Sequence, residues 1–486
     1  MKNSRFPFMA RFLEFTKKVL SAVALAASLA TSAAAAPNIV IVIADDMGWG
    51  DVGFHGSEIR TPELDRLAAG GVRFERFYTY ALCSPTRAAL MTGRSGINTG
   101  MLGPSNPWYP RGLPVDEKLM PEYFREAGYR THALGKWHLG PNELQYHPMN
   151  HGFESFYGHL HGYLNHELHT LFGRVDWQRD GQTVHETGNA TDLVIAEAVR
   201  LIEERDPDAP FLLHVALDAP HAPLQAPEDA IAEYAHVDDE RRRIYSAMMT
   251  EMDRGIARIT AALEEARIAE NTLLIFFSDN GGSPNLGADN GPLRGGKGSP
   301  FEGGTRAPAF MYWPTVLPAG AVFEERMTVT DLLPTLLAAA DADLHASKPI
   351  DGRDFWPAIA DGAQAPGGPA VLSHYGRGVV QHAYFRDDWK LVRAANDQGG
   401  TDDLLFDIRN DPYEQHDLAA AHPDIFRQLV AELDAIPKAE PLSLNARLPD
   451  MTAPGSPMAW EPDNRPPGGM PYAESGPVPY PEGNYP

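Results

Sequence analysis

Four continuous apolar runs alternate with amphipathic stretches along this chain. Because their apolar residues follow one another without alternation, the runs are typical of strands buried on both faces of a sheet; they are 38–46 (NIVIVIADD), 130–138 (RTHALGKWH), 211–221 (FLLHVALDAPH) and 272–282 (TLLIFFSDNGG). Apolar residues at helical spacing predict helices over 61–71 and 246–266, and Thr61 followed by Pro62 favours a helix start. Strands that alternate with helices predict an α/β domain with a largely parallel central sheet.

The pattern changes at both ends of the chain. Basic residues, the apolar run 19–30 and a small-residue stretch ending near Ala36 predict a signal peptide over 1–36 and an exported protein, most simply periplasmic. A membrane anchor is the weaker alternative, because the run is short. Near residue 370 shorter strand candidates begin, AVLSHYG and HAYFRDDWKLVRA, and the last part is rich in Pro and Gly. We expect a main domain over 37–370, a C-terminal subdomain over 371–448 and a tail over 449–486.

Charge and cysteine content exclude several classes of protein. The net charge is −24, and removal of the basic segment 1–36 makes it more negative, which argues against nonspecific nucleic-acid binding. An anionic substrate would therefore need a local cluster of positive groups. Cys83 is the single cysteine, so intrachain disulfides and a cysteine-rich zinc site are excluded.

Each of the four apolar runs ends in polar residues. Ligands of open α/β sheets bind outside the carboxyl ends of the strands, so these residues predict one shared site: Asp45, Asp46, Lys136, His138, His221, Asp279 and Asn280. Taken singly, each motif is equally typical of a turn, a helix cap or a surface segment. The coincidence of all four favours the functional interpretation.

The residue types indicate the chemistry of this site. Asp45, Asp46, Asp279 and Asn280 offer only oxygen ligands, which select Ca²⁺ or Mg²⁺, and the crowded carboxylates require a cation between them. Further positive groups would hold an anion; they are Arg87, Lys136, His138, His221 and Lys297. This combination suits hydrolysis of a sulfate or phosphate ester, with a histidine and a lysine to protonate the departing oxygen.

A nucleophile is found through a family resemblance. The stretch CSPTRAALMTGR resembles the motif Cys-x-Pro-x-Arg of type I sulfatases, and further blocks resemble that family in the expected order: ADDMGWGDVGFHGS, TPELDRLAAGGVRFERFY, EAGYRTHALGKWHLG, APHAPLQAP, SDNGG and PLRGGKGSPFEGGTRAP. The chain is most similar to the arylsulfatase B, or N-acetylgalactosamine 4-sulfatase-like, branch. The resemblance covers most of 38–310 and continues more weakly through 329–340.

The resemblance implies an alkaline-phosphatase-like fold, in which a large, mostly parallel sheet is flanked by helices and a smaller α+β subdomain carries an antiparallel sheet. It implies hydrolysis of sulfate esters, of sulfated carbohydrate or aryl sulfates. A maturation enzyme would oxidise Cys83 to Cα-formylglycine, whose hydrate is the nucleophile. One Ca²⁺ would be bound by Asp45, Asp46, Cys83 in its modified form, Asp279 and Asn280.

The resemblance also implies a role for each positive group. Arg87 would hold the hydrate and the carboxylates, and Lys136 would contact the sulfate. His138 would be the base that helps to eliminate sulfate, and the remaining pair would bind the sulfate and assist the leaving alcohol: His221 and Lys297. Thr86 stands where many relatives have serine, and its retained hydroxyl is expected to permit maturation.

Alternatives remain open from the sequence. A phosphomonoester or phosphonate hydrolase could use the same scaffold, and a non-catalytic, calcium-dependent binder of anionic glycans would keep Cys83 as a thiol. The histidine-rich segment 147–169 is interpreted either as part of the substrate-pocket rim or as a polar surface loop, with a zinc site as a weaker hypothesis.

Overall fold

The computed structural model describes residues 36–105, 112–141, 143–171 and 173–438. The expected tail over 449–486 and nearly all of the expected signal peptide lie outside the described residues. Within them, no helix combines the length and the apolar character that a membrane span requires.

The main sheet has ten strands with a parallel centre. Their spatial order is β13 (Ala321–Phe323), β2 (Val72–Phe74), β12 (Ala309–Tyr312), β11 (Thr272–Ser278), β1 (Asn38–Ala44), β10 (Phe211–Ala216), β4 (Arg130–Lys136), β5 (Ser155–His159), β8 (Gln178–Arg179) and β9 (Gln182–Thr183). The four predicted strands are confirmed as the neighbours β11, β1, β10 and β4, all mutually parallel, so that their carboxyl ends meet at one edge. Antiparallel partners join outside them, at β12 and β8, which makes the whole sheet mixed.

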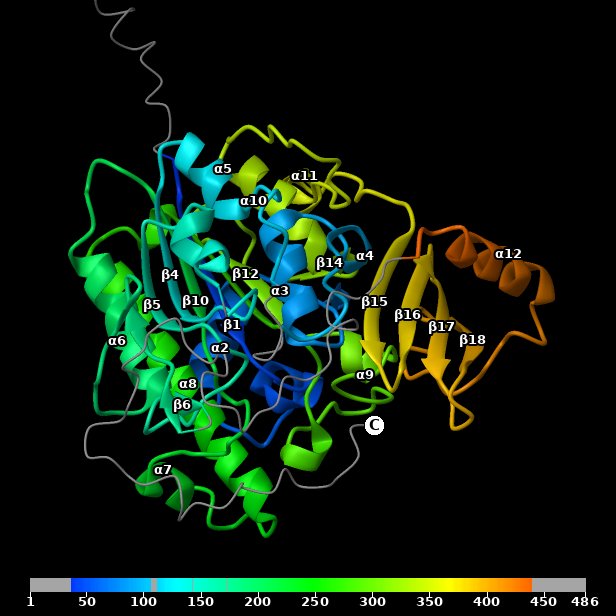
Figure 1. Ribbon diagram of the computed structural model, residues 1–486, viewed down its shortest axis with the longest axis horizontal. Helices are drawn as coiled ribbons and strands as arrows, with labels where there is room; N and C mark the ends of the chain where they lie inside the picture. The colour runs from blue at the N-terminus through cyan, green and yellow to red at the C-terminus, as the bar shows by residue number, and fades with distance from the viewer. Residues whose placement is uncertain (1–35, 106–111, 142, 172, 439–486) are drawn as a thin grey trace, which may run out of the picture. The chain divides into compact units, whose positions relative to one another are not determined.

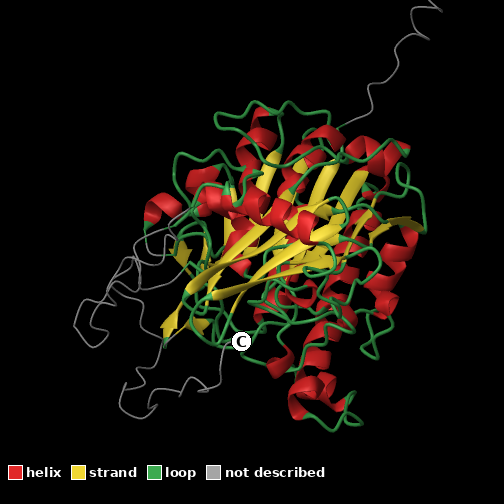
Figure 2. Ribbon diagram, turned by 90° about the vertical axis from the view of Figure 1, so that its right-hand side faces the viewer, coloured by secondary structure: helices red, strands yellow, loops and turns green. Residues whose placement is uncertain are grey.

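Helices cover both faces of this sheet (Figure 2). Along β1, Ile39, Ile41 and Ile43 pack into one core, and the intervening Val40 and Val42 pack into the other. The first core is covered by α3 (Cys83–Thr92), α5 (Met120–Glu126), α10 (Leu332–Ala339) and α11 (Trp356–Asp361). The second is covered by α2 (Pro62–Gly70), α6 (Ala190–Glu203), α7 (Glu228–Ala232) and α8 (Glu240–Glu265). Burial on both faces explains why the central strands are continuously apolar.

The C-terminal region forms a separate four-stranded antiparallel sheet (Figure 1). Its strands are β15 (Ala370–Gly376), β16 (Val379–Arg386), β17 (Trp389–Ala395) and β18 (Thr401–Asp407), and α12 (Pro423–Asp434) packs on it through Leu429 and Leu433. The smaller elements are α4 (Gly96–Thr99), α9 (Glu302–Thr305) and the pairs β3 (Phe77–Tyr78) with β14 (Met327–Thr328) and β6 (Thr170–Leu171) with β7 (Arg174–Val175).

Two predicted elements differ in detail from the structure. The run HAYFRDDWKLVRA is not one strand but a hairpin of β16 and β17, because Asp387 and Asp388 form its turn and Asp387 has φ 53°. The helix predicted over 246–266 begins earlier, at Glu240, because the Asp239 side chain accepts hydrogen bonds from two backbone N–H groups of the first turn. The helix predicted over 61–71 is confirmed as α2, with Thr61 before its first residue.

Candidate active site

The parallel register of β1 and β11 builds the acidic part of the site. Ala44 pairs with Ser278 at the ends of these strands, which places Asp45 and Asp46 beside Asp279. One ligand atom from each of these carboxylates and the sulfur of Cys83 all lie within 4.8 Å of one another, and all four residues are buried. The sequence prediction that distant segments meet here agrees with this geometry.

The donor atoms of this cluster fit a hard cation. Three buried oxygens have no hydrogen-bond partner among the described residues: Asp45 Oδ1, Asp279 Oδ1 and Asn280 Oδ1. Asn280 Nδ2 donates to Asp46 Oδ1 at 2.7 Å, which leaves the Asn280 oxygen available. Burial and the charge of Asp45 raise the pKa of Asp279 to about 7. A divalent cation with oxygen ligands would satisfy the three atoms and neutralise this repulsion.

Arg87 ties the acidic cluster to α3. Its guanidinium is 2% exposed; Nε and Nη2 donate to Asp279 Oδ2 at 3.1 and 2.8 Å, and Nη1 donates to the Lys136 carbonyl at 2.9 Å. Nη2 also lies 3.7 Å from Asp45 Oδ2. The planar fork therefore fixes two carboxylates and the end of β4 at once.

Cys83 is the first residue of α3 and is buried beside these groups. Burial raises the pKa of its thiol to about 12, so an unmodified thiol would remain protonated at neutral pH and be a poor nucleophile. The turn before it is closed by Thr86, whose Oγ1 accepts from the Tyr80 backbone N at 2.9 Å. The threonine hydroxyl thus has a structural use in this chain.

Two lysines lie against the aspartates at the end of β1. Lys136 forms an ion pair with Asp45, and Lys297 Nζ donates to Asp46 Oδ2 at 2.7 Å. Although burial opposes it, Asp46 and other negative groups raise the pKa of Lys297 well above its usual value. Lys136 and neighbouring cations hold the pKa of Asp45 well below its usual range, again against the effect of burial. Both ammonium groups therefore stay charged.

The two predicted histidines have defined ring contacts. His138 Nε2 lies 3.1 Å from the Ser105 carbonyl and must donate to it, which leaves Nδ1 as a buried acceptor without a partner among the described residues. Burial, assisted by Lys136, lowers the pKa of His138 well below its usual value. His221 Nδ1 lies 2.6 Å from the Ala222 carbonyl, and its Nε2 lies 3.5 Å from Asp46 Oδ2.

The histidine-rich segment is not a polar surface loop. Six of its histidines are buried; they are His147, His151, His159, His161, His166 and His169. His161 Nδ1 pairs with Asp176 at 2.6 Å, and His166 Nε2 donates to the carbonyl of the predicted site residue His221 at 3.1 Å. Sequence reasoning missed the neighbour Tyr163, whose ring stacks on His221 at 5.8 Å between centroids; no local sequence signal marks this residue.

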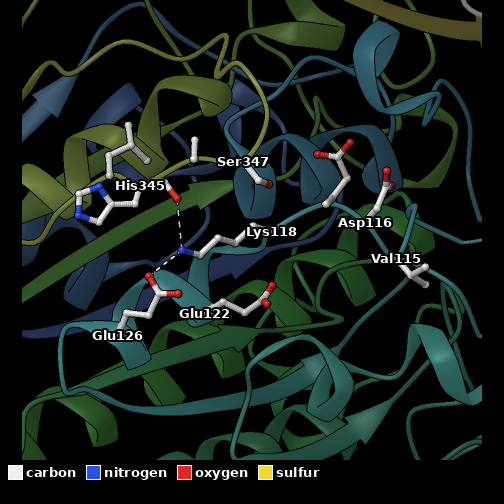
Figure 3. A pocket seen from close by; sticks show the side chains of 10 residues that line it. Val115, Asp116, Lys118, Glu122, Glu126, His345 and Ser347 are labelled. Atoms are coloured by element: carbon white, nitrogen blue, oxygen red, sulfur yellow. Dashed lines mark hydrogen bonds and ion pairs between the residues drawn. The ribbon is translucent and has the colours of Figure 1, made fainter.

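A surface pocket lies apart from these residues. It has a volume of about 660 Å³ and is lined by Val115, Asp116, Glu117, Lys118, Glu122, Glu126, Leu344, His345, Ala346 and Ser347. Lys118 Nζ donates to Glu126 and to the His345 carbonyl within it (Figure 3). It contains none of the predicted site residues.

Fold and site together are typical of a hydrolase in which a buried acidic cluster, able to hold a metal ion, lies beside fixed cations. Residues 37–342 match the Sulfatase family. The chain is 38% identical over 371 residues to N-acetylgalactosamine-6-sulfatase of Canis lupus familiaris, covering 71% of this chain and 69% of that protein. It is 32% identical over 461 residues to arylsulfatase J of Mus musculus, covering 84% of this chain and 77% of that protein.

A solved structure extends the similarity to the fold. The crystal structure of Ps i-CgsB in complex with k-i-k-neocarrahexaose is 34% identical, with a TM-score of 0.77, and the match covers 83% of this chain and 94% of that chain. The chain belongs to the sulfatase family and is a sulfuric ester hydrolase. The predicted family, fold class and enzyme class are confirmed.

Proposed function

We propose that this sulfatase hydrolyses sulfate esters of carbohydrate, with a Ca²⁺ ion held by Asp45, Asp46, Asp279 and Asn280 and a formylglycine derived from Cys83. The observation that carries the proposal is the buried cluster of Asp45, Asp46, Asp279 and Cys83, together with three buried oxygens, one of them on Asn280, that have no hydrogen-bond partner among the described residues. When present, the cation would neutralise charge on the sulfate, and the formylglycine hydrate would supply the nucleophilic oxygen and a further ligand.

The residues of the chain would position the sulfate and its nucleophile. Arg87 keeps Asp45 and Asp279 in place through its fork. Lys136 and Lys297 add two permanent positive charges, and both would contact the sulfate oxygens. Together with His221 they form the proposed substrate-binding set. Because these groups are already held by Asp45 and Asp46, little reorganisation is needed when charge develops on the sulfate.

Proton transfer falls to the two histidines and Lys297. His138 is neutral, and its buried Nδ1 is free to accept a proton, which suits the base that helps to expel sulfate. His221 Nε2 and Lys297 Nζ both lie against Asp46, so they can act as a pair on one leaving oxygen. We assign them to assistance of the departing alcohol, with Lys297 as the proton donor, since the ring proton of His221 is held on Nδ1 by the Ala222 carbonyl.

Carbohydrate is the proposed substrate class. N-acetylgalactosamine-6-sulfatase is named for a sugar sulfate, and Ps i-CgsB was crystallised with an oligosaccharide. A panel of defined sulfated saccharides, with inorganic sulfate release as the readout, tests the proposal. We expect release from at least one saccharide by the matured protein. Release from simple aryl sulfates only would contradict the carbohydrate assignment.

The phosphate alternative leads to a direct comparison. With a divalent cation bound and the nucleophilic oxygen ionised, the cations and carboxylates of the site leave one net positive charge, which matches a sulfate monoester better than a doubly charged phosphate monoester. We expect a higher kcat/KM for 4-nitrophenyl sulfate than for 4-nitrophenyl phosphate, measured by nitrophenol release at one pH. The reverse order would favour the phosphomonoester or phosphonate hydrolase.

Calcium should stabilise the folded protein through the same residues. At a free concentration of 100 times its Kd, a ligand adds about 2.7 kcal/mol to the free energy of unfolding, so we expect Ca²⁺ to raise the Tm by several degrees. Asn280→Ala removes one ligand and should raise the calcium concentration needed for the same increase in Tm by about tenfold or more.

The matched control for calcium is Asp289→Asn, because this nearby carboxylate is exposed and lies outside the cluster. Differential scanning calorimetry with and without Ca²⁺ should give the wild-type shift for this control. Equal calcium shifts in the Asn280 variant and the wild type would count against the assigned ligand set.

Export and domain division complete the proposal. Residues 1–36 would act as the signal peptide of a protein directed most simply to the periplasm, and a maturation enzyme would modify Cys83 before folding. The catalytic domain would span 37–370 and the subdomain 371–448. The start of the four-stranded sheet at Ala370 supports that boundary.

A further inference from the structure

Lys297 lies in a glycine-rich loop that has no regular secondary structure. Three glycines of this loop adopt positive φ angles: Gly291 at 59°, Gly295 at 82° and Gly298 at 79°. Such a segment has few intrinsic restraints, so the position of the Lys297 backbone depends on contacts from outside the loop. Two are made by the main domain: Lys297 N donates to the Gly282 carbonyl at 3.0 Å, and Gly298 N donates to the Ala81 carbonyl at 2.8 Å.

A third contact comes from the C-terminal sheet. His374 lies in β15, the strand of that sheet that lies next to α4 (Figure 1). Its side chain is 1% exposed, and Nε2 lies 2.9 Å from the carbonyl of Gly298, the residue directly after Lys297. Because a carbonyl can only accept, the ring proton must be on Nε2. Burial lowers the pKa of His374 to about 4, so the ring remains neutral.

The three contacts fix the backbone on both sides of Lys297. On the other end of the residue, the ammonium group pairs with Asp46. Loss of the His374 bond would leave the Gly298 carbonyl without this donor and free a glycine loop to shift. Displacement of a catalytic group by about 1 Å can cost on the order of 100-fold in rate.

We propose that His374 is a positioning residue for Lys297, so that the C-terminal sheet takes part in the departure of the leaving group. The inference rests on the proposed role of Lys297. It assigns the subdomain a function in catalysis in addition to packing. His374 acts only through the Gly298 carbonyl and needs no contact with the substrate.

Leaving-group dependence provides the test. We would compare kcat/KM of matured, full-length wild type, His374→Phe and His374→Gln on 4-nitrophenyl sulfate and on phenyl sulfate, whose leaving group is more basic. Phenylalanine keeps a ring and removes the donor, whereas glutamine retains an N–H donor. We expect His374→Phe to lose about 10- to 100-fold on phenyl sulfate and less than about threefold on 4-nitrophenyl sulfate, and His374→Gln to recover much of the loss.

A merely structural role predicts a different result. If the substitution only lowered the amount of folded enzyme, both substrates would lose activity by the same factor. The matched control is His382→Phe in β16, because His382 Nδ1 contacts Ser373 Oγ at 2.7 Å within the same sheet. This variant should keep the wild-type ratio of kcat/KM on 4-nitrophenyl sulfate to kcat/KM on phenyl sulfate.

Lys297→Met distinguishes a failure of the proposed role of Lys297 from a failure of the proposed role of His374. If this variant itself shows no larger loss on phenyl sulfate, the proposed role of Lys297 is wrong. If Lys297→Met shows the larger loss but His374→Phe lowers both substrates equally or neither, the positioning role of His374 is overturned. In the double variant of Lys297→Met and His374→Phe, the loss of kcat/KM on phenyl sulfate relative to that on 4-nitrophenyl sulfate should be no larger than in Lys297→Met alone.

Discussion

Replacement of Cys83 by alanine is expected to lower the rate of sulfate release by about 10⁴-fold or more, because the variant cannot form the proposed nucleophile. The protein should still fold, with a drop of only a few degrees in Tm, since the substitution removes only one small buried group. Initial rates with 4-nitrophenyl sulfate and a thermal melt measure the two effects. Peptide mass spectrometry of the wild type should find an aldehyde in place of the Cys83 thiol.

Unmatured protein and a conservative variant are the controls for this experiment. Wild-type chain produced without a maturation enzyme should be nearly as inactive as Cys83→Ala, because the buried thiol has a pKa of about 12. Thr86→Ser should retain activity, since a serine hydroxyl can accept the hydrogen bond from Tyr80 N. An alanine variant as active as the wild type would refute the nucleophile assignment.

The second large effect concerns stability and the junction of the two sheets. Lys390 in β17 is fully buried, and its ammonium lies 2.8 Å from one oxygen of Glu302 and 2.8 Å from one oxygen of Glu414. Lys390→Met would leave two buried carboxylates without their cation, and we expect the free energy of unfolding to fall by about 3–5 kcal/mol. Denaturant titration followed by circular dichroism measures this loss.

The loss should depend on pH with a defined sign. Burial raises the pKa of Glu414 to about 7 even beside Lys390, and removal of the lysine raises it further. A carboxyl group whose pKa is raised on folding destabilises the protein as pH rises from its unfolded pKa to its folded pKa. The variant should therefore lose less stability at pH 5 than at pH 8.

An exposed ion pair is the matched control for Lys390. Arg427 and Asp424 form a salt bridge with side chains 74% and 91% exposed, so Arg427→Met should cost less than about 1 kcal/mol. Equal losses in Lys390→Met and Arg427→Met would show that the buried cluster does not stabilise the junction. Adding Glu302→Gln and Glu414→Gln to Lys390→Met should recover part of the loss, because the unpaired charges are removed.

The central strands and the meeting of the acidic residues at their ends were predictable from the sequence for a physical reason. A strand covered on both faces must be continuously apolar, so 38–44 and 272–278 are marked by composition alone. The residues directly after such strands emerge at the sheet edge, which made Asp45 and Asp279 recognisable as candidates. The family resemblance then supplied Cys83, which no periodicity would indicate.

Local details were less predictable because they depend on single capping and turn interactions. The polar start of α8 at Glu240 carries no apolar periodicity, and the Asp239 cap decides where the helix begins. The two strands of the β16–β17 hairpin were predicted as one strand, because the turn between them has only two residues. The burial of His147 and of the other histidines of segment 147–169 could not be predicted from the sequence either, since histidine is found both in cores and on surfaces.

By itself, the sequence determined the central buried strands and the two predicted helices, since these follow from local residue types. It also indicated candidate side chains for the chemistry, from the strand ends and from the family resemblance. Only the tertiary structure decided the strand order β11-β1-β10-β4 and the reach of Arg87 to Asp279. It also decided that His374 holds the Gly298 carbonyl beside Lys297. These contacts join residues 76 to 192 positions apart, and their formation depends on the packing of whole sheets and helices, which no local pattern encodes.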